Sequence, residues 1–189
     1  MFTPSAAPAV SVTLSEDKEV HWFVMRSLTN LLQMEDRLQQ EGLECFLPKT
    51  TRLRAGQRSR RIEVVPVVPP YIFVHANYDS IRAFKQKVDR LSFIPVLGTS
   101  THSTMKVSDK EMEDFIRVVS QREEKTHIYS AGEIPLAPGQ RIRICGGPLA
   151  GVEGKLVKLK GARDKRLMVS VGGILLATTP IDKTFVQLL

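Results

Sequence analysis

The sequence is poor in the features that mark exported and membrane-bound proteins. It contains two cysteines in 189 residues. Because Cys45 and Cys145 are far apart and each lies in an apolar run, both are expected to be buried free thiols in a reducing compartment. No stretch approaches the roughly 20 apolar residues of a membrane span. The N-terminus lacks the basic segment and the continuous apolar run of a signal peptide. These absences predict a cytoplasmic protein without a membrane partner.

Catalytic and metal-binding constellations are also missing from the sequence. The histidines are scattered along the chain: His21, His75, His102 and His127. None of them has a cysteine or a carboxylate at the spacing of metal ligands. The acidic cluster at residues 109–114 suits the first turn of a helix, where negative charge is favourable. We therefore expect neither an enzyme nor a protein that holds a metal or another cofactor.

A glycine-rich stretch at residues 139–159 suggests a phosphate-binding loop, but its spacing excludes one. A P-loop needs a glycine five residues before Gly154, where this sequence has Leu149. It also needs Ser or Thr after Lys155, and Leu156 stands there instead. The flanking residues alternate between apolar and basic, which is typical of strands. The loop is therefore predicted to join two strands, and four glycines are expected to allow positive φ or close backbone approach. These are Gly146, Gly147, Gly151 and Gly154.

The feature that the sequence does have is an uneven excess of positive charge. The net charge is +7, from 27 basic and 20 acidic residues. From residue 131 onward, nine basic residues face four acidic ones. A second basic cluster contains no acid and consists of Lys49, Arg52, Arg54, Arg58, Arg60 and Arg61. Local excesses of this kind favour polyanionic partners, most commonly nucleic acid.

Periodicity predicts an α+β domain at residues 20–122. Strands are expected at 20–26, 43–48, 62–68, 71–74 and 91–94, and helices at 29–41 and 79–87. Ser108 and Glu111 form a capping box at the start of a third helix that ends near residue 122. The basic segment 49–61 is predicted to be the tip of a β-hairpin or a mobile loop. Alternation puts Tyr71 and Phe73 on one face of a strand. An antiparallel sheet flanked by helices follows.

The remaining segments complete the predicted domain organisation. Residues 1–19 are expected to be a disordered extension. Residues 123–138 lose periodicity and contain Pro135 and Pro138, so they are assigned to a linker. Residues 139–189 hold five short strand-like runs separated by turn signals, which predicts a small antiparallel β-barrel.

Two blocks of sequence then resemble a known family. The block at 139–157 resembles the KOW motif at the end of NusG-type transcription elongation factors. The N-terminal part resembles the NGN domain of the same family through Trp22-Phe23-Val24, Phe46-Leu47-Pro48, a basic hairpin, Val65-Pro66 and Tyr71-Ile72-Phe73-Val74. Together the two blocks cover about residues 20–189 in the family's order. Residues 115–119 and 146–154 look most similar to the UpxY capsule-locus antiterminators, with RfaH as a more distant relative.

The resemblance implies a monomeric factor that binds the clamp helices of the largest subunit of bacterial RNA polymerase. Such a factor promotes processive elongation and opposes termination, with specialised members acting at chosen operons such as those for surface polysaccharides. By motif position, Tyr71, Phe73 and Phe93 are the expected polymerase-binding residues. Arg26 and the basic cluster would contact non-template DNA or nascent RNA. The KOW domain would recruit a ribosomal protein or, alternatively, dock on the NGN domain.

A second interpretation is an RNA-binding or ribosome-associated KOW protein. In that case basic residues of the C-terminal domain, namely Lys158, Lys160 and Arg163, would carry the RNA contact.

Overall fold

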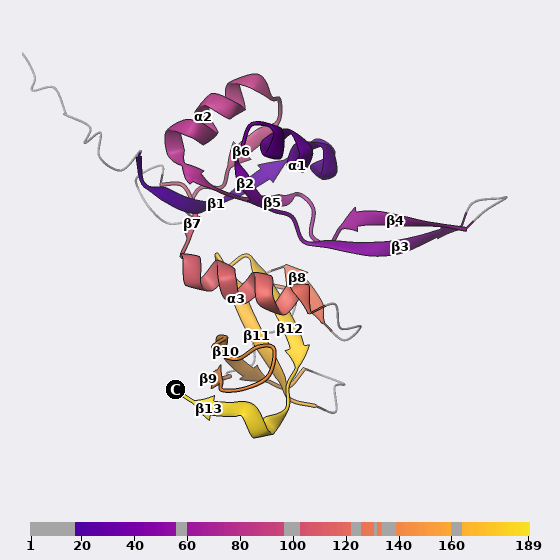
Figure 1. The fold of residues 1–189 in the computed structure, drawn as a ribbon, viewed down its shortest axis with the longest axis vertical. Coiled ribbons are helices and arrows are strands. Elements are labelled where there is room, and N and C mark those ends of the chain that lie inside the picture. The colour runs from indigo at the N-terminus through magenta and orange to yellow at the C-terminus, as the bar shows by residue number, and fades with distance from the viewer. Residues whose placement is uncertain are drawn as a thin grey trace, which may run out of the picture.

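The computed structural model describes residues 18–55, 60–96, 103–121, 126–130, 132–133, 139–159 and 164–189. Within these ranges no helix is long and apolar enough to cross a membrane. The chain forms an N-terminal sheet, a separate two-stranded hairpin and a C-terminal sheet (Figure 1).

The N-terminal sheet is antiparallel and confirms the predicted α+β class. Its strands are β1 (Val20–Ser27), β2 (Glu44–Phe46), β5 (Tyr71–Asn77), β6 (Leu91–Phe93) and β7 (Lys106–Val107). The strand order is β2-β5-β1-β6, and β7 pairs with β1 as well. Strand β1 is central because its apolar and aromatic residues are buried along most of its length.

Each of the three α-helices in the described part of the chain begins at a side chain that caps it. Helix α1 (Leu31–Gln40) starts after Asn30, whose side-chain oxygen accepts the N–H of Leu32 at 3.0 Å. Helix α2 (Tyr78–Lys87) starts after Asn77, which accepts the N–H of Ser80 at 2.8 Å. Helix α3 (Asp109–Ser120) starts after Ser108, as its capping pattern predicts. These caps satisfy backbone donors that the first helical turn leaves unpaired.

The two faces of the N-terminal sheet are covered by different helices. Alternation places Ile72 and Val74 on one face, where they form a core with residues of α1 and α2. Phe73 lies on the other face, in a core with Phe115 of α3. The alternation predicted for this strand is therefore confirmed, and both of its faces are buried.

The C-terminal part forms a six-stranded antiparallel sheet in the order β13-β9-β10-β11-β12-β8. Its strands are β8 (His127–Ser130), β9 (Gln140–Ile144), β10 (Glu153–Val157), β11 (Arg166–Val171), β12 (Leu175–Pro180) and β13 (Val186–Leu188), with a short 3-10 helix η2 (Lys183–Phe185) before the last strand. Strand β8 lies inside the range assigned from sequence to the linker and pairs with β12. In the described residues β13 and β8 are the two ends of the sheet, so closure into a KOW barrel stays a prediction.

The prediction that both cysteines are buried is wrong for one of them. Cys45 is partly buried, but Cys145 is exposed. Strand β9 points Ile142 and Ile144 into the core, so the next residue along an alternating chain points outward.

Helix α3 lies between the N-terminal and C-terminal sheets (Figure 1). A single core joins Val24 and Phe73 of the first sheet, Met112 and Phe115 of α3, and the inner face of the C-terminal sheet. The inner face contributes buried residues from three strands: Ile142, Ile144, Leu167, Val169, Val171, Leu175 and Ala177. The helix therefore packs on two sides at once.

Candidate nucleic-acid and partner interface

The basic segment folds as a hairpin that stands apart from both sheets. Strand β3 (Lys49–Ala55) pairs with β4 (Arg60–Pro66), and this two-stranded sheet has no further strand among the described residues. Threonine and β-branched residues favour the extended conformation here. The hairpin projects sideways from the N-terminal sheet (Figure 1). The predicted hairpin is confirmed, and the basic segment 49–61 includes all of strand β3 and the start of β4.

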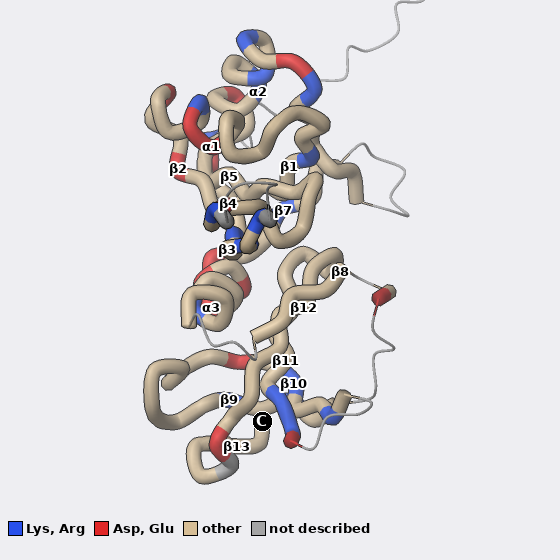
Figure 2. The backbone as a smooth tube through the Cα atoms, turned by 90° about the vertical axis from the view of Figure 1, so that its right-hand side faces the viewer, with Lys and Arg blue, Asp and Glu red and all other residues tan. Residues whose placement is uncertain are grey.

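The hairpin carries Arg52, Arg54 and Arg61 on one face, whereas alternation puts Lys49, at its base, on the opposite face. Arg52 lies opposite Glu63, and Arg54 lies opposite Arg61. All three arginines are exposed, and blue segments mark Lys and Arg positions on β3 and β4 in Figure 2. Arg54 reaches Glu63 at 3.6 Å, a contact between exposed groups that is worth little in water. The face therefore offers guanidinium groups that are available to an anion.

Four other residues are predicted to contact nucleic acid, namely Arg26, Lys49, Arg58 and Arg60. The Nζ of Lys49 contacts both carboxylate oxygens of Glu35 on α1, at 2.9 and 2.8 Å, so this lysine fastens the base of the hairpin to the helix. Arg26 is exposed on β1 of the main sheet. The backbone of Arg60 pairs with that of Ala55, while Arg58 lies outside the described residues.

The three predicted polymerase-binding aromatics do not share one face of the sheet. Phe73 has no exposed surface and packs between Phe46 and Phe115, with ring centroids 6.5 and 5.8 Å away. Tyr71 lies on the same face and is partly exposed. Phe93 packs with the core on the opposite face.

Phe93 is held by its neighbours on the face that α1 and α2 cover. Its ring stacks on Tyr78 with centroids 4.9 Å apart, and the Nζ of Lys85 lies 4.8 Å from its centroid. Phe93 also keeps part of its surface exposed. Of the three aromatics, Tyr71 and Phe93 are thus the ones that reach the surface, at separate places, while Phe73 supports the sheet from within.

A set of polar side chains on α3, not predicted from the sequence, forms hydrogen bonds with the C-terminal part. We call Lys110, Glu111, Asp114 and Arg117 the α3 clasp. Lys110 Nζ donates to the carbonyl of Gly151 at 3.0 Å. Arg117 Nη2 donates to the carbonyl of Pro148 at 3.0 Å. The only signal in the sequence is helical spacing, because positions 110, 114 and 117 share one side of a helix.

The two acidic residues of the clasp, Glu111 and Asp114, accept hydrogen bonds from backbone N–H groups. Asp114 Oδ2 accepts the N–H of Glu153 at 3.1 Å, and Glu111 Oε1 accepts the N–H of Gly172 at 3.0 Å. The Asp114 side chain is only 4% exposed and is also paired with Lys110. Burial raises the pKa of Glu111, and the hydrogen bond from Gly172 partly offsets that rise.

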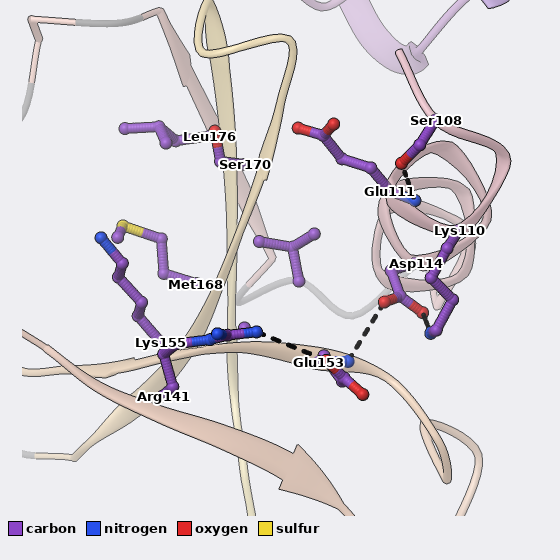
Figure 3. A pocket seen from close by; sticks show the side chains of 12 residues that line it. Ser108, Lys110, Glu111, Asp114, Arg141, Glu153, Lys155, Met168, Ser170 and Leu176 are labelled. Carbon is purple, nitrogen blue, oxygen red and sulfur yellow. Dashed lines mark hydrogen bonds and ion pairs between the residues drawn. The ribbon is translucent and has the colours of Figure 1, made fainter. Parts of the chain in front are cut away.

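A cleft of about 420 Å³ lies beside the clasp, between α3 and the C-terminal sheet (Figure 3). Acidic Glu111 and Asp114 line its helix side, and basic Arg141 and Lys155 line its strand side. Arg143 holds the pKa of the nearby Glu153 carboxyl below its usual range through a 2.6 Å contact. Asp114 and Glu153, which line the cleft, are thus paired with basic side chains of the protein itself. Among the described residues no group of His, Cys, Asp and Glu could hold a metal ion.

The glycine-rich loop between β9 and β10 has the geometry of a tight connection. Gly147 and Gly151 have φ of 73° and 86°, which side chains rarely adopt. At Gly154 a Cβ would lie 2.4 Å from the carbonyl oxygen of Met168, so β10 needs glycine to approach β11. A Cβ at Gly146 would lie 2.5 Å from the ring of Phe185. The loop carries the carbonyl groups of Pro148 and Gly151, which accept hydrogen bonds from side chains of α3.

Comparison with known proteins places these features in a family. The NusG family model, described as transcription termination factor nusG, matches residues 20–116. A solved structure described as "Domain interaction in Thermotoga maritima NusG" is similar at 17% identity over 89% of this chain and 97% of that one, with a TM-score of 0.44. A crystal structure of an MjSpt4:Spt5 complex is similar at 15% identity over 89% of this chain and 96% of that one, with a TM-score of 0.26. No curated protein matches the chain. Because the family model spans more than half of the chain, from β1 into α3, the protein belongs to the NusG family of transcription factors.

Proposed function

We propose that the protein is an elongation factor that binds the clamp helices of the largest subunit of bacterial RNA polymerase and promotes processive transcription. The observation that carries the proposal is the family match over residues 20–116, which contain the N-terminal sheet and the projecting basic hairpin. In this role the chain acts as a binding protein and not as an enzyme. The proposal keeps residues 20–122 and 139–189 as the two domains.

The proposed polymerase contact uses aromatic side chains at the surface of the N-terminal domain. Tyr71 and Phe93 are partly exposed, and aromatic residues dominate the energetics of protein interfaces. Phe73 contributes indirectly, because its buried ring supports the strand that carries Tyr71. The same complex would bring Arg52, Arg54 and Arg61 to non-template DNA or nascent RNA, where they would contact phosphates without reading sequence.

A binding measurement with purified core RNA polymerase tests this proposal. Wild-type protein should bind at moderate salt, and Tyr71→Ala should weaken binding by about 2 kcal/mol if the ring is a central contact. Tyr129→Ala, in β8 of the C-terminal sheet, is the matched control and should bind like wild type. Circular dichroism checks that each variant is folded. If wild-type protein does not associate with polymerase, the proposal is wrong.

The proposal extends to antitermination at particular operons, such as those for surface polysaccharides, in the manner of the UpxY and RfaH types. Its support is the resemblance of residues 115–119 and 146–154 to those proteins. Genome-wide polymerase occupancy with and without the protein tests this part. A specialised factor should change occupancy in the distal parts of a few long operons, whereas a general factor should change it in most transcription units.

The alternative is a KOW protein that binds RNA or the ribosome through its C-terminal part. The observation that favours it is exposed basic surface on that part: Lys155 and Lys158 are exposed, and Lys155 lies at the cleft. Lys160 and Arg163, which are also predicted to contact RNA, lie outside the described residues. In a pull-down against polymerase and ribosomes, retention of ribosomes or RNA alone would favour this alternative.

A further inference from the structure

The β3–β4 hairpin has a second face that is apolar. Leu53 lies directly opposite Ile62, and Thr51 lies opposite Val64. Alternation separates these residues from Arg52, Arg54 and Arg61, which point to the other side of the ribbon. We call Leu53, Ile62 and Val64 the apolar strip. The hairpin thus presents a basic face and an apolar face.

The apolar strip is open to solvent. The exposed fractions are 59% for Leu53, 75% for Ile62 and 46% for Val64. These are three of the nine large hydrophobic residues that are exposed among the described residues, and they lie side by side on one ribbon. A two-stranded hairpin is at best marginally stable alone, so an apolar face left in water is a cost that a contact would remove.

The base of the hairpin is fixed to the N-terminal domain while the strip is not covered. Lys49 is paired with the largely buried carboxylate of Glu35, and the N–H of Val67 donates to the carbonyl of Pro48 at 2.9 Å. These contacts set the direction in which the hairpin leaves the domain. The position of the strip relative to the N-terminal domain is therefore fixed by the base of the hairpin.

A second copy of the chain does not fit as the occupant. A stable interface needs roughly 20–30 residues from each partner. Three aliphatic side chains on a narrow ribbon are far fewer, and the copies would each carry a net charge of +7. The strip suits a secondary contact that adds to a larger one made elsewhere on the same partner.

We propose that the apolar strip docks on an apolar protein surface of RNA polymerase while the arginine face of the same hairpin contacts nucleic acid. This inference rests on the proposed function, because polymerase supplies the larger contact. The distribution of charge supports it: Arg52, Arg54 and Arg61 lie on the face away from the strip, and Lys49, at the base on the strip's own face, is paired with Glu35. A phosphate backbone favours the basic face, so the apolar face is left for protein.

The test compares binding to a polymerase–nucleic-acid complex with binding to the nucleic acid alone. The variant is Leu53→Thr with Ile62→Thr, because threonine keeps the preference for strands and removes apolar surface. The matched control is Leu188→Thr, which alters a residue of similar exposure, 57%, in the C-terminal sheet. The double variant should bind the polymerase complex about tenfold more weakly, the equivalent of burying one to two methylene groups less. Its binding to the nucleic-acid scaffold alone should be unchanged.

Four results would overturn the inference. Wild-type affinity of the double variant for the complex would show that polymerase does not use the strip, and the proposed function would stand. Weaker binding of the double variant to the scaffold alone would make nucleic acid the occupant. A wild-type dimer that the substitutions dissociate, measured by light scattering, would make a second copy the occupant. Failure of the wild-type protein to bind polymerase would remove both the inference and the proposed function. Thermal unfolding of the variant near the wild-type temperature is the check on folding.

Discussion

The two cysteines differ in environment, and this difference predicts their reactivity. Burial, followed by the carboxylate of Glu35, raises the pKa of the Cys45 thiol from 9.0 to about 11. Cys145 is exposed and directly follows β9. Because the thiolate is the reactive form, Cys45 should remain almost unmodified by iodoacetamide at pH 8 in the folded protein, and Cys145 should be alkylated.

Mass spectrometry of tryptic peptides measures both sites in one experiment. Unfolding in urea is the control, because it should make the two thiols react at similar rates. Rapid alkylation of Cys45 in the folded protein would contradict the environment described for it.

Glu111 predicts a dependence of stability on pH. Burial raises its pKa above 4.5 in the folded protein, so the protonated form is favoured by folding. The stabilising contribution of protonated Glu111 is fully present below about pH 4.5 and is lost as the pH rises through the raised value. Glu111→Gln keeps an oxygen for the N–H of Gly172 and removes the charge. It should raise stability at pH 7 by less than about 1 kcal/mol, because the group is only partly buried and solvent screens its charge.

Urea unfolding of Glu111→Gln and wild type between pH 4.5 and 7 gives the comparison. The difference in unfolding free energy should grow with pH. Glu113→Gln, at an exposed position on the same helix, is the control and should show a much smaller trend. A variant that is less stable than wild type at pH 7 would mean that the Glu111 charge is favourable where it stands.

The β3–β4 hairpin shows which parts of an element a sequence can predict. The run of basic residues and the alternation of Thr, Leu, Ile and Val predict a ribbon with nucleic-acid affinity. They do not reveal that Lys49 forms an ion pair with Glu35, because that pair joins residues on two different elements, β3 and α1. Nor do they show which residues of β4 share a face with Leu53, since that depends on the pairing register.

Removing the arginines of the hairpin should change how nucleic-acid binding depends on salt. Each phosphate that the protein no longer neutralises lowers the slope of log K against log salt by about 1. Replacing Arg52, Arg54 and Arg61 with glutamine should therefore flatten the slope for a single-stranded DNA probe by about 2 to 3. Filter binding or fluorescence anisotropy over a range of salt concentrations measures the slope.

Lys49→Gln is the matched control for the arginine variants. It removes one positive charge, but this charge is paired with Glu35 and should contribute little to phosphate binding. The variant should lower the melting temperature and leave the salt slope near that of wild type. If Lys49→Gln flattens the slope as much as a single arginine substitution does, Lys49 contacts nucleic acid directly, as its place in the basic cluster predicts.

The strands and helices within each part of the molecule are largely predictable from sequence, but the way the parts meet is not. The periodicity of α3 predicts one apolar stripe, and Ser108 predicts the cap at its first turn. Both are present in the structure. The helix packs on two sheets because Phe115 faces one sheet while the clasp meets backbone groups of the other. Backbone carbonyl and N–H groups carry no sequence signal, so contacts to Gly151 and Glu153 cannot be read from residue patterns. Strand β8 escapes prediction because four residues in a segment with prolines show no period.

The contact between α3 and the C-terminal sheet depends on Asp114, and the effect of removing its carboxylate should be measurable. Asp114 is buried, pairs with Lys110 and accepts the N–H of Glu153. Asp114→Ala leaves that N–H without its acceptor, which costs about 1–3 kcal/mol. Hydrogen exchange should therefore accelerate at the amide of Glu153 and in the loop that precedes it. Glu113→Ala, one position away but exposed, should leave the exchange rates as they are. Equal protection in wild type and Asp114→Ala would mean that apolar packing holds the helix against the C-terminal sheet without the hydrogen bond of Asp114.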